Sequence, residues 1–175
     1  PRSRTGSAQI VRPVRCINQK RLNNEMHGQR IENGHLATHQ RIYWRIYLMI
    51  SFEPQIIICN EFAKIPEYQS KGAAALDLSA AIEFPIEIPP GQTKKIGTGL
   101  KIWIQNPHIC GAILPRSGLS TKYGIVLANG VGLVDADYQG EWIVSLHNRM
   151  DCAYVISPGE RIAQAMFLPV ILAEF

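Results

Sequence analysis

The stretch KKIGTGLKIWIQNPHICGAIL, residues 94–114, indicates the fold class of this chain. Two apolar segments, 94–104 and 108–114, flank the turn signal QNPH, in which Asn and Pro favour a change of chain direction. Neither segment carries the 3.6-residue apolar period of an amphipathic helix. We therefore expect two strands joined by a short turn, as in an antiparallel sheet.

The same alternation of strand-like segments and turn signals continues over the rest of the chain. Turn signals such as PPGQ at 89–92 and SPGE at 157–160 separate the segments, and a short helical turn is expected only near SGLSTKYG at 117–124. This pattern predicts an all-β sandwich, jelly roll or barrel. The predicted strands are a first, buried one within 49–62, followed by 75–80, 84–88, 94–104, 108–114, 124–128, 141–148, 153–157 and 162–175.

The 175-residue chain is predicted to contain one folded domain, residues 49–175, and an irregular basic extension, residues 1–48. Residues 1–50 hold nine Lys/Arg and two Asp/Glu, whereas the rest of the chain holds nine and twelve. The extension has neither a basic amphipathic period nor interleaved aromatic residues, which favours an incidental segment over a nucleic-acid-binding arm. Because the chain begins with Pro1, we expect Met49 to be the native start.

Composition argues against a membrane protein and against a zinc site. The longest apolar run, residues 42–50, is short and contains Arg45, and the opening residues lack the apolar core of a signal peptide. The cysteines form no CxxC pair, so we expect reduced thiols and a cytoplasmic location. From the apolar run and the basic extension we expect neither a membrane nor a nucleic acid as partner. These cysteines are Cys16, Cys59, Cys110 and Cys152.

Four separated stretches carry polar groups suited to an anionic ligand: AAALDLSA (73–80), PRSGLSTKYG (115–124), ANGVGLVDADYQGEW (128–142) and PGERIAQAMF (158–167). Arginine supplies a fork of donors, serine a hydroxyl, and glycine lets backbone N–H groups approach an anion. Each stretch taken alone also fits an ordinary turn or strand edge, since Asp and Gly are common turn residues. The candidate site residues are Asp77, Arg116, Ser117, Gly118, Asn129, Gly132, Asp135, Asp137, Tyr138, Arg161 and Gln164.

In their order and spacing these four stretches resemble the motifs of the trimeric dUTPase family, and the resemblance runs from about Ile65 to Phe175. It implies a distorted jelly-roll or β-barrel fold and a homotrimer whose active sites combine segments of three subunits. It also implies cleavage of dUTP to dUMP and pyrophosphate, with Mg²⁺ held on the triphosphate. Such an activity limits the entry of uracil into DNA and supplies dUMP for dTMP synthesis.

The resemblance implies roles for the hairpin residues first. Asp135 falls where the family keeps the carboxylate that activates the attacking water, and Tyr138 falls where a ring packs under the deoxyribose. Asn129, with the backbone around Gly130 to Gly132, matches the segment that pairs with the uracil edge. Asp137 matches a structural position, where we expect it to tie down the hairpin through hydrogen bonds.

The remaining stretches match the phosphate and metal subsites of the family. Arg116, Ser117, Gly118 and Gln164 fall at positions that contact the phosphates. Asp77 matches the acid that reaches the metal through water, and Arg161 matches a structural position. Phosphoanhydride cleavage depends on positioning, on neutralising phosphate charge and on one group that orients water, and these residue types supply all three.

The sequence departs from the family pattern at two places. Ala75 stands where the family usually has a glycine before the Leu-Asp pair. The chain ends at LPVILAEF, before the family's glycine-rich, phenylalanine-containing tail, so we expect a truncated product with impaired turnover. Two alternatives stay open: a non-catalytic dUTP-binding or regulatory module of the same fold, and a dCTP deaminase-like enzyme, against which the sequence VDADYQG argues.

Overall fold

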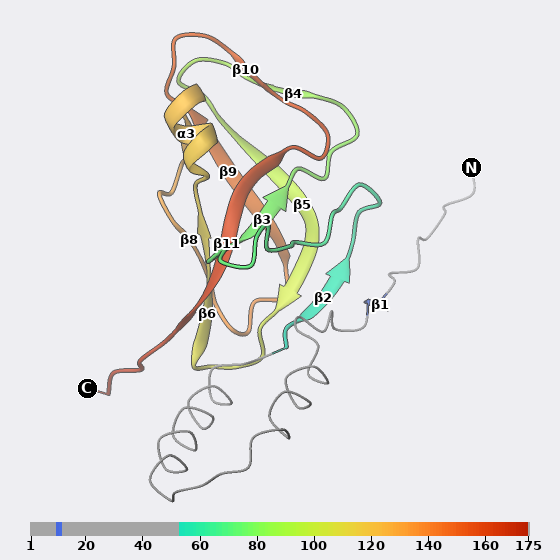
Figure 1. Ribbon diagram of the computed structural model, residues 1–175, viewed down its shortest axis with the longest axis vertical. Helices are drawn as coiled ribbons and strands as arrows, with labels where there is room; N and C mark the ends of the chain where they lie inside the picture. The colour runs from blue at the N-terminus through green and yellow to red at the C-terminus, as the bar shows by residue number, and fades with distance from the viewer. Residues whose placement is uncertain (1–9, 12–52, 175) are drawn as a thin grey trace, which may run out of the picture. The chain divides into compact units, whose positions relative to one another are not determined.

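A computed structural model of the chain describes residues 10–11 and 53–174. The strands in this part form a five-stranded sheet in the order β1-β2-β5-β9-β7, a four-stranded sheet in the order β3-β11-β6-β8, and the pair β10-β4, all with antiparallel pairing (Figure 1). The all-β prediction is therefore confirmed. The strands are β1 Ile10–Val11, β2 Gln55–Ile58, β3 Leu76–Ser79, β4 Ile86–Ile88, β5 Thr93–Trp103, β6 Ile109–Leu114, β7 Ile125–Leu127, β8 Gly132–Val134, β9 Glu141–Asn148, β10 Tyr154–Ile156 and β11 Arg161–Pro169.

Most of the predicted strands are present at the predicted positions, but the structure differs from the prediction at three places. The strand predicted within 49–62 is only β2, and its residues are exposed or half-buried instead of buried. The last strand ends at Pro169, and beyond it Ile171 is 96% exposed. Strand β8 was not predicted, because its three residues stand between glycine and aspartate turn signals. The predicted extension 1–48 lies outside the described residues except for β1.

The two larger sheets pack their inner faces together around Trp142 of β9. Along β9 buried Trp142, Val144 and Leu146 alternate with more exposed residues, which is the two-residue period of a half-buried strand. The Trp142 ring lies 6.2 Å from the ring of Phe167 on β11, and a Cβ added to Gly111 on β6 would meet the indole at 2.8 Å. Glycine at 111 thus gives the indole the space that the inter-sheet core requires.

The short helical turn predicted near residues 117–124 is present as α3, Ser117–Tyr123. Arg116 precedes it with an extended backbone, and Gly124 ends it in the left-handed conformation at φ 64°, which glycine adopts without strain. Leu119 is the buried residue that anchors this helix to the domain. The helix therefore presents its first residues, the predicted phosphate-contacting ones, at a fixed corner after β6.

The small β4–β10 sheet is fixed to the end of β9 by Asn148. Its buried side-chain amide donates to the carbonyl oxygens of Ile88 at 2.9 Å and Cys152 at 2.8 Å, and its oxygen accepts from the Met150 N–H at 2.9 Å. A buried amide with both ends hydrogen-bonded specifies one arrangement of the segments around it. This bonding ties the end of β4 and the segment before β10 to the end of β9. In the part of the chain that the structure describes, no helix is long and apolar enough to cross a membrane.

Candidate functional site

Residues 128–141, the predicted hairpin, carry β8 with a tight turn on each side of it, and β8 pairs with β6 and not with β9. At the first, before β8, the Val131 N–H donates to the Asn129 carbonyl at 2.8 Å, and Gly130 has a φ of 72° that favours glycine. At the second, after β8, the Tyr138 N–H donates to the Asp135 carbonyl at 3.2 Å, while the Ala136 carbonyl accepts from Gln105 at 3.0 Å. Backbone hydrogen bonds thus fix the positions from which Asn129, Asp135 and Tyr138 project.

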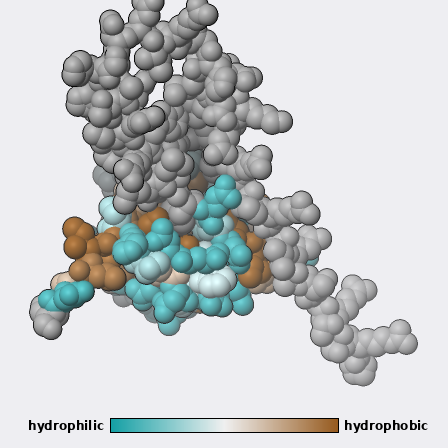
Figure 2. Space-filling view, turned by 90° about the horizontal axis from the view of Figure 1, so that it is seen from below, coloured by the Kyte–Doolittle hydropathy of each residue, from teal (hydrophilic) through white to brown (hydrophobic). Residues whose placement is uncertain are grey.

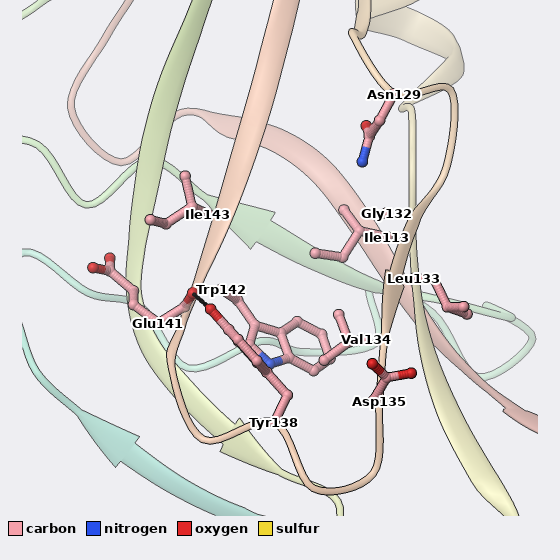
Figure 3. Close-up of a pocket in the computed structure, with 10 residues that line it drawn as sticks. All are labelled: Ile113, Asn129, Gly132, Leu133, Val134, Asp135, Tyr138, Glu141, Trp142 and Ile143. Atoms are coloured by element: carbon pink, nitrogen blue, oxygen red, sulfur yellow. Dashed lines mark hydrogen bonds between the residues drawn. The ribbon is translucent and has the colours of Figure 1, made fainter.

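These turns enclose a pocket of about 280 Å³ against β9 (Figure 3). Four predicted site residues from the hairpin line it, with Asn129 at one end and Asp135 and Tyr138 toward the other (Figure 3). A volume of this order suits a small ring system. The lining residues are Ile113, Asn129, Gly132, Leu133, Val134, Asp135, Tyr138, Glu141, Trp142 and Ile143.

Tyr138 and Asp135 differ in how they are held. The Tyr138 hydroxyl donates to the Glu141 carbonyl at 3.1 Å, which fixes the ring across the hairpin while the side chain stays 44% exposed. The Asp135 carboxylate is exposed and has no hydrogen-bond or ion-pair partner among the described residues. A fixed ring can support a flat ligand, and an unengaged carboxylate can accept a proton or orient a water.

Asp137 does not anchor the hairpin as the sequence suggested. Its side chain is exposed, and no described residue donates to its carboxylate. The turn is held by the backbone bonds at Tyr138 and Gln105 and by the Tyr138 hydroxyl instead. The side-chain anchoring by Asp137 that the sequence suggested thus has no counterpart among the described residues.

Sequence reasoning missed six residues of the pocket, and two of them, Glu141 and Trp142, shape it most clearly. Glu141 Oε1 accepts the Gly99 N–H at 2.7 Å and so ties the pocket to β5. Trp142 is 1% exposed. Among the buried side-chain polar atoms of the described residues, its Nε1 is the one that has no hydrogen-bond partner. The alternation along β9 could have indicated that Trp142 is buried, but no local signal shows that it borders a pocket.

A second cluster gathers around Asp77 on β3. Its Oδ1 accepts from Arg116 Nε and its Oδ2 from Arg161 Nη1, both at 2.9 Å, and the Asp77 side chain is 13% exposed. Gln69 Oε1 also accepts from Arg161 Nη1, at 3.2 Å, and was not a predicted site residue. Arg116 Nη1 donates to the Arg161 carbonyl at 2.9 Å. One carboxylate therefore fixes two guanidinium groups that come from distant parts of the chain.

Gln164, Ser117 and Gly118 border this cluster. Gln164 lies directly opposite Asp77 in the sheet, and its Nε2 donates to the Pro115 carbonyl at 3.0 Å, beside Arg116. Ser117 and Gly118 are exposed at the start of α3, and a Cβ added to Gly118 would meet nothing within 4 Å. The surface next to the two arginines is thus open to an anion.

Gly132 and Val134 of the pocket lie on the face of the four-stranded sheet opposite to Asp77 and Gln164. Asp77, Gln164 and Leu114 are direct cross-strand neighbours and so share one face. Ile113, one residue earlier on β6, pairs with Gly132 and belongs to the inner face, where it is 5% exposed. The structure therefore brings together the hairpin residues at one place and the arginine-rich residues at another.

The donor set around Asp77 fits a metal ion carried by a ligand. Among the described residues no group of three or more His, Cys, Asp or Glu side chains could hold a metal by itself. Each Asp77 oxygen accepts one arginine N–H and retains a lone pair for a metal-bound water. Magnesium commonly keeps several waters and binds through one or two carboxylates plus substrate phosphates.

An antiparallel β fold with an arginine-bearing cluster and a separate small pocket defines a class of all-β proteins suited to a phosphorylated ligand with a ring. Comparison with known proteins then gives the family. The sequence profile of the dUTPase family matches residues 61–175, and the chain belongs to this family. The backbone φ of Ala75 is not positive, so alanine is accommodated there without backbone strain.

The curated relatives agree with this assignment. The chain is 52% identical over 118 residues to the deoxyuridine 5'-triphosphate nucleotidohydrolase of Tolumonas auensis, a match that covers 67% of this chain and 78% of the relative. It is 55% identical over 122 residues to the protein of the same name from Blochmanniella pennsylvanica, which covers 68% and 82% of the two chains.

Solved structures show the same fold at lower identity. A Staphylococcus bacteriophage 80alpha dUTPase solved with the nucleotide analogue dUpNHpp superposes with a TM-score of 0.65 at 23% identity, over 71% of this chain and 95% of that one. The dUTPase of phage phi11 of S. aureus, described with a structural Mg(II) ion, superposes with a TM-score of 0.63 at 23% identity, over 70% and 94% of the two chains. These likenesses support the jelly-roll class of the fold.

Proposed function

We propose that this chain hydrolyses dUTP to dUMP and pyrophosphate. The observation that carries the proposal is that Asn129, Gly132, Asp135 and Tyr138 line one pocket in a chain whose curated relatives are named for this reaction. The chemistry requires that water attack the α-phosphorus while the bond from that phosphorus to the bridging oxygen breaks and pyrophosphate leaves. In this proposal the reaction supplies dUMP and removes dUTP in the cytoplasm.

In the pocket, Asn129 and the backbone of the first turn read the uracil edge. Glycine at 132 leaves space in the pocket next to Asn129. A Cβ at this position would lie 3.6 Å from Asn129 Nδ2 and 3.0 Å from the Ile113 Cβ. The Tyr138 ring packs under the deoxyribose and leaves no space for a 2′-hydroxyl. A site with these polar groups rejects a base of the wrong donor pattern, because buried groups would stay unpaired.

Asp135 orients the attacking water and accepts its proton. The carboxylate suits this role because it makes no other hydrogen bond within the described part of the chain and borders the same pocket as the ring-binding residues. One positioned acid–base group typically accelerates a reaction by about 10²–10⁴-fold. Asp137, two residues away and without side-chain contacts to described residues, has no part in the step.

The phosphates bind at the arginine cluster. The Nε and Nη1 groups of Arg116 donate to Asp77 and to the Arg161 carbonyl. Its Nη2 group is left to donate to an anion, next to Ser117, Gly118 and Gln164. Asp77 would reach a Mg²⁺ ion on the triphosphate through water, and that ion would neutralise phosphate charge when bound. Arg161 holds Asp77 in place and has no direct role toward the phosphates.

The placement of Gly132 and Asp77 on opposite faces of one sheet supports a homotrimer with shared sites. A nucleotide bound in the pocket of one subunit would place its phosphates against the arginine cluster of a neighbour, so that a single chain supplies half of a site. Exposed apolar side chains are available for such contacts, among them Leu133 at 69% and Ile143 at 48% exposure. Figure 2 shows hydrophobic residues at both margins of one face of the described domain, around a hydrophilic centre.

The test separates turnover from binding. The chain should release pyrophosphate from dUTP and much less from UTP or dCTP, because those analogues lack the sugar or base pattern that the pocket accepts. Asp135→Asn should lower turnover by roughly a hundredfold or more and leave the affinity for a non-hydrolysable dUTP analogue within about twofold. Asp137→Asn is the matched control and should retain full turnover.

Three results would overturn the proposal in different ways. Analogue binding without pyrophosphate release from the unmodified chain would support a non-catalytic dUTP-binding module. Release of ammonia from dCTP would support a deaminase. Full turnover in Asp135→Asn would leave dUTP as substrate but would remove Asp135 from the step.

A further inference from the structure

The two arms of the arginine cluster come from different elements. The first arm is the corner Arg116–Ser117 at the start of α3, and the second is Arg161 at the start of β11. They meet at Asp77 and through the hydrogen bond from Arg116 Nη1 to the Arg161 carbonyl. These contacts join the arms at their tips. A second connection is present at their far ends, between the end of α3 and the turn that joins β10 to β11.

Tyr154 on β10 contacts both far ends. Its ring lies against the ring of Tyr123, the last residue of α3, with centroids 5.2 Å apart and planes inclined by 50°. Its hydroxyl donates to Glu160 Oε1 at 2.6 Å, and Glu160 directly precedes Arg161. Figure 1 shows α3 and β10 at the same end of the domain. One side chain therefore joins the helix that carries the first arm to the turn that carries the second.

Glu160 makes this connection rigid. Its second carboxylate oxygen accepts the Ser157 N–H at 2.8 Å, and its backbone carbonyl accepts the Ala80 N–H at 2.8 Å, directly after β3. Both ends of the residue are thus fixed before the chain reaches Arg161. A hydrogen bond from a hydroxyl to a carboxylate at this distance is among the stronger ones in proteins.

The Tyr154 hydroxyl keeps its proton and stays a donor. Burial raises the pKa of Tyr154 well above its usual range, and the hydrogen bond to Glu160 raises it further. The charged groups that face it are the Glu160 carboxylate and, across the Tyr123 ring, the ammonium group of Lys122, which lies 5.0 Å from that ring centroid. The connection to Glu160 therefore persists over the whole neutral pH range.

We propose that Tyr154 is a positioning residue that sets the spacing between the Arg116–Ser117 corner and Arg161, and so tunes the affinity of this cluster for the triphosphate. The inference deepens the proposed function and rests on it. Tyr154 touches neither substrate nor metal. It acts through Tyr123 on one side and through Glu160 on the other, and it leaves the hairpin pocket unaffected.

The experiment compares ligands with and without phosphates on the full chain. Tyr154→Phe removes the hydroxyl and keeps the ring against Tyr123, so the fold is retained. Its affinity for a non-hydrolysable dUTP analogue with Mg²⁺ should fall roughly tenfold, whereas that for deoxyuridine should stay within about twofold. For dUTP hydrolysis KM should rise more than kcat falls. Tyr68→Phe, which removes an exposed hydroxyl without a described partner, is the control.

A second variant and a second measurement keep the outcome decisive. Glu160→Gln, in a chain that keeps Tyr154, leaves one acceptor oxygen for two donors, the Tyr154 hydroxyl and the Ser157 N–H, and should lower the affinity for the dUTP analogue in the same direction as Tyr154→Phe. Hydrogen exchange of the Arg116 Nε–H, followed by NMR without ligand, should accelerate severalfold in Tyr154→Phe but not in Tyr68→Phe, because the ion pair with Asp77 loosens.

Equal losses for both ligands, or no loss together with unchanged exchange at Arg116, would overturn the positioning role. If the unmodified chain neither binds the dUTP analogue nor hydrolyses dUTP, the proposed function fails instead. The exchange rate at Arg116 alone then decides whether Tyr154 fixes the cluster.

Discussion

Asp77 connects more of the candidate site than any other described side chain. It faces away from the leucines that flank it on β3, and its two oxygens bind arginines that are 39 and 84 residues further along the chain. Gln164 lies opposite it in the sheet, so the carboxylate stands at the centre of the arginine cluster. With two cations on one mostly buried acid, loss of its charge would leave both guanidinium groups uncompensated.

Asp77→Asn should therefore destabilise the domain as well as impair function. We expect the free energy of unfolding to fall by about 2 kcal/mol, the usual scale for losing a charge-assisted hydrogen bond in a partly buried site. Affinity for a dUTP analogue should also fall, since Arg116 loses its fixed direction. Denaturant titration and calorimetry measure the two effects. Glu87→Gln, an exposed carboxylate on β4, is the control and should change neither. Unchanged stability in Asp77→Asn would contradict the described ion pairs.

At the scale of elements, much of the fold could be predicted from local sequence, and the site could be predicted only through its motifs. Strong turn signals bounded β5 and β9 to within one residue, and the position of α3 was also predicted. Strand β8 was not predicted, because the glycine and aspartate residues on either side of it indicate a turn. The arginine cluster depends on pairings such as Gln164 with Asp77, and local sequence contains no information on register between strands so far apart.

Gly99 on β5 offers a test of how tightly the elements fit. It has a φ of 68°, and an added Cβ would lie 2.7 Å from the Ala63 Cβ and 2.9 Å from the Ala81 Cβ. Gly99→Ala should lower the free energy of unfolding by about 3 kcal/mol, because it combines left-handed backbone strain with overpacking. Gly72→Ala, where an added Cβ meets nothing within 4 Å, should be nearly neutral. Equal stability of the two variants, measured by denaturant titration, would refute this account of β5.

At the scale of the whole molecule, the positions of the pocket and the arginine cluster bear on the oligomeric state that we propose. Gly132 of the pocket and Asp77 of the arginine cluster lie on opposite faces of one sheet, and in our proposal a nucleotide that needs both binds between chains. Two apolar residues that line the pocket, Leu133 and Ile143, are also exposed. A trimer would bury them and complete the sites at the same time, whereas a monomer would leave each site half-built.

The most direct test of a shared site mixes two inactive variants. Asp135→Asn lacks the water-orienting carboxylate in the pocket, and Arg116→Ala lacks a donor in the arginine cluster, so each alone should be nearly inactive toward dUTP. If every site takes its pocket from one subunit and its arginine cluster from another, mixed trimers refolded from equal amounts should recover about a quarter of the unmodified activity, by random assembly. Sedimentation should show trimers in all three samples. Trimers that recover no activity on mixing, or a monomer with full activity, would contradict the shared dUTP site.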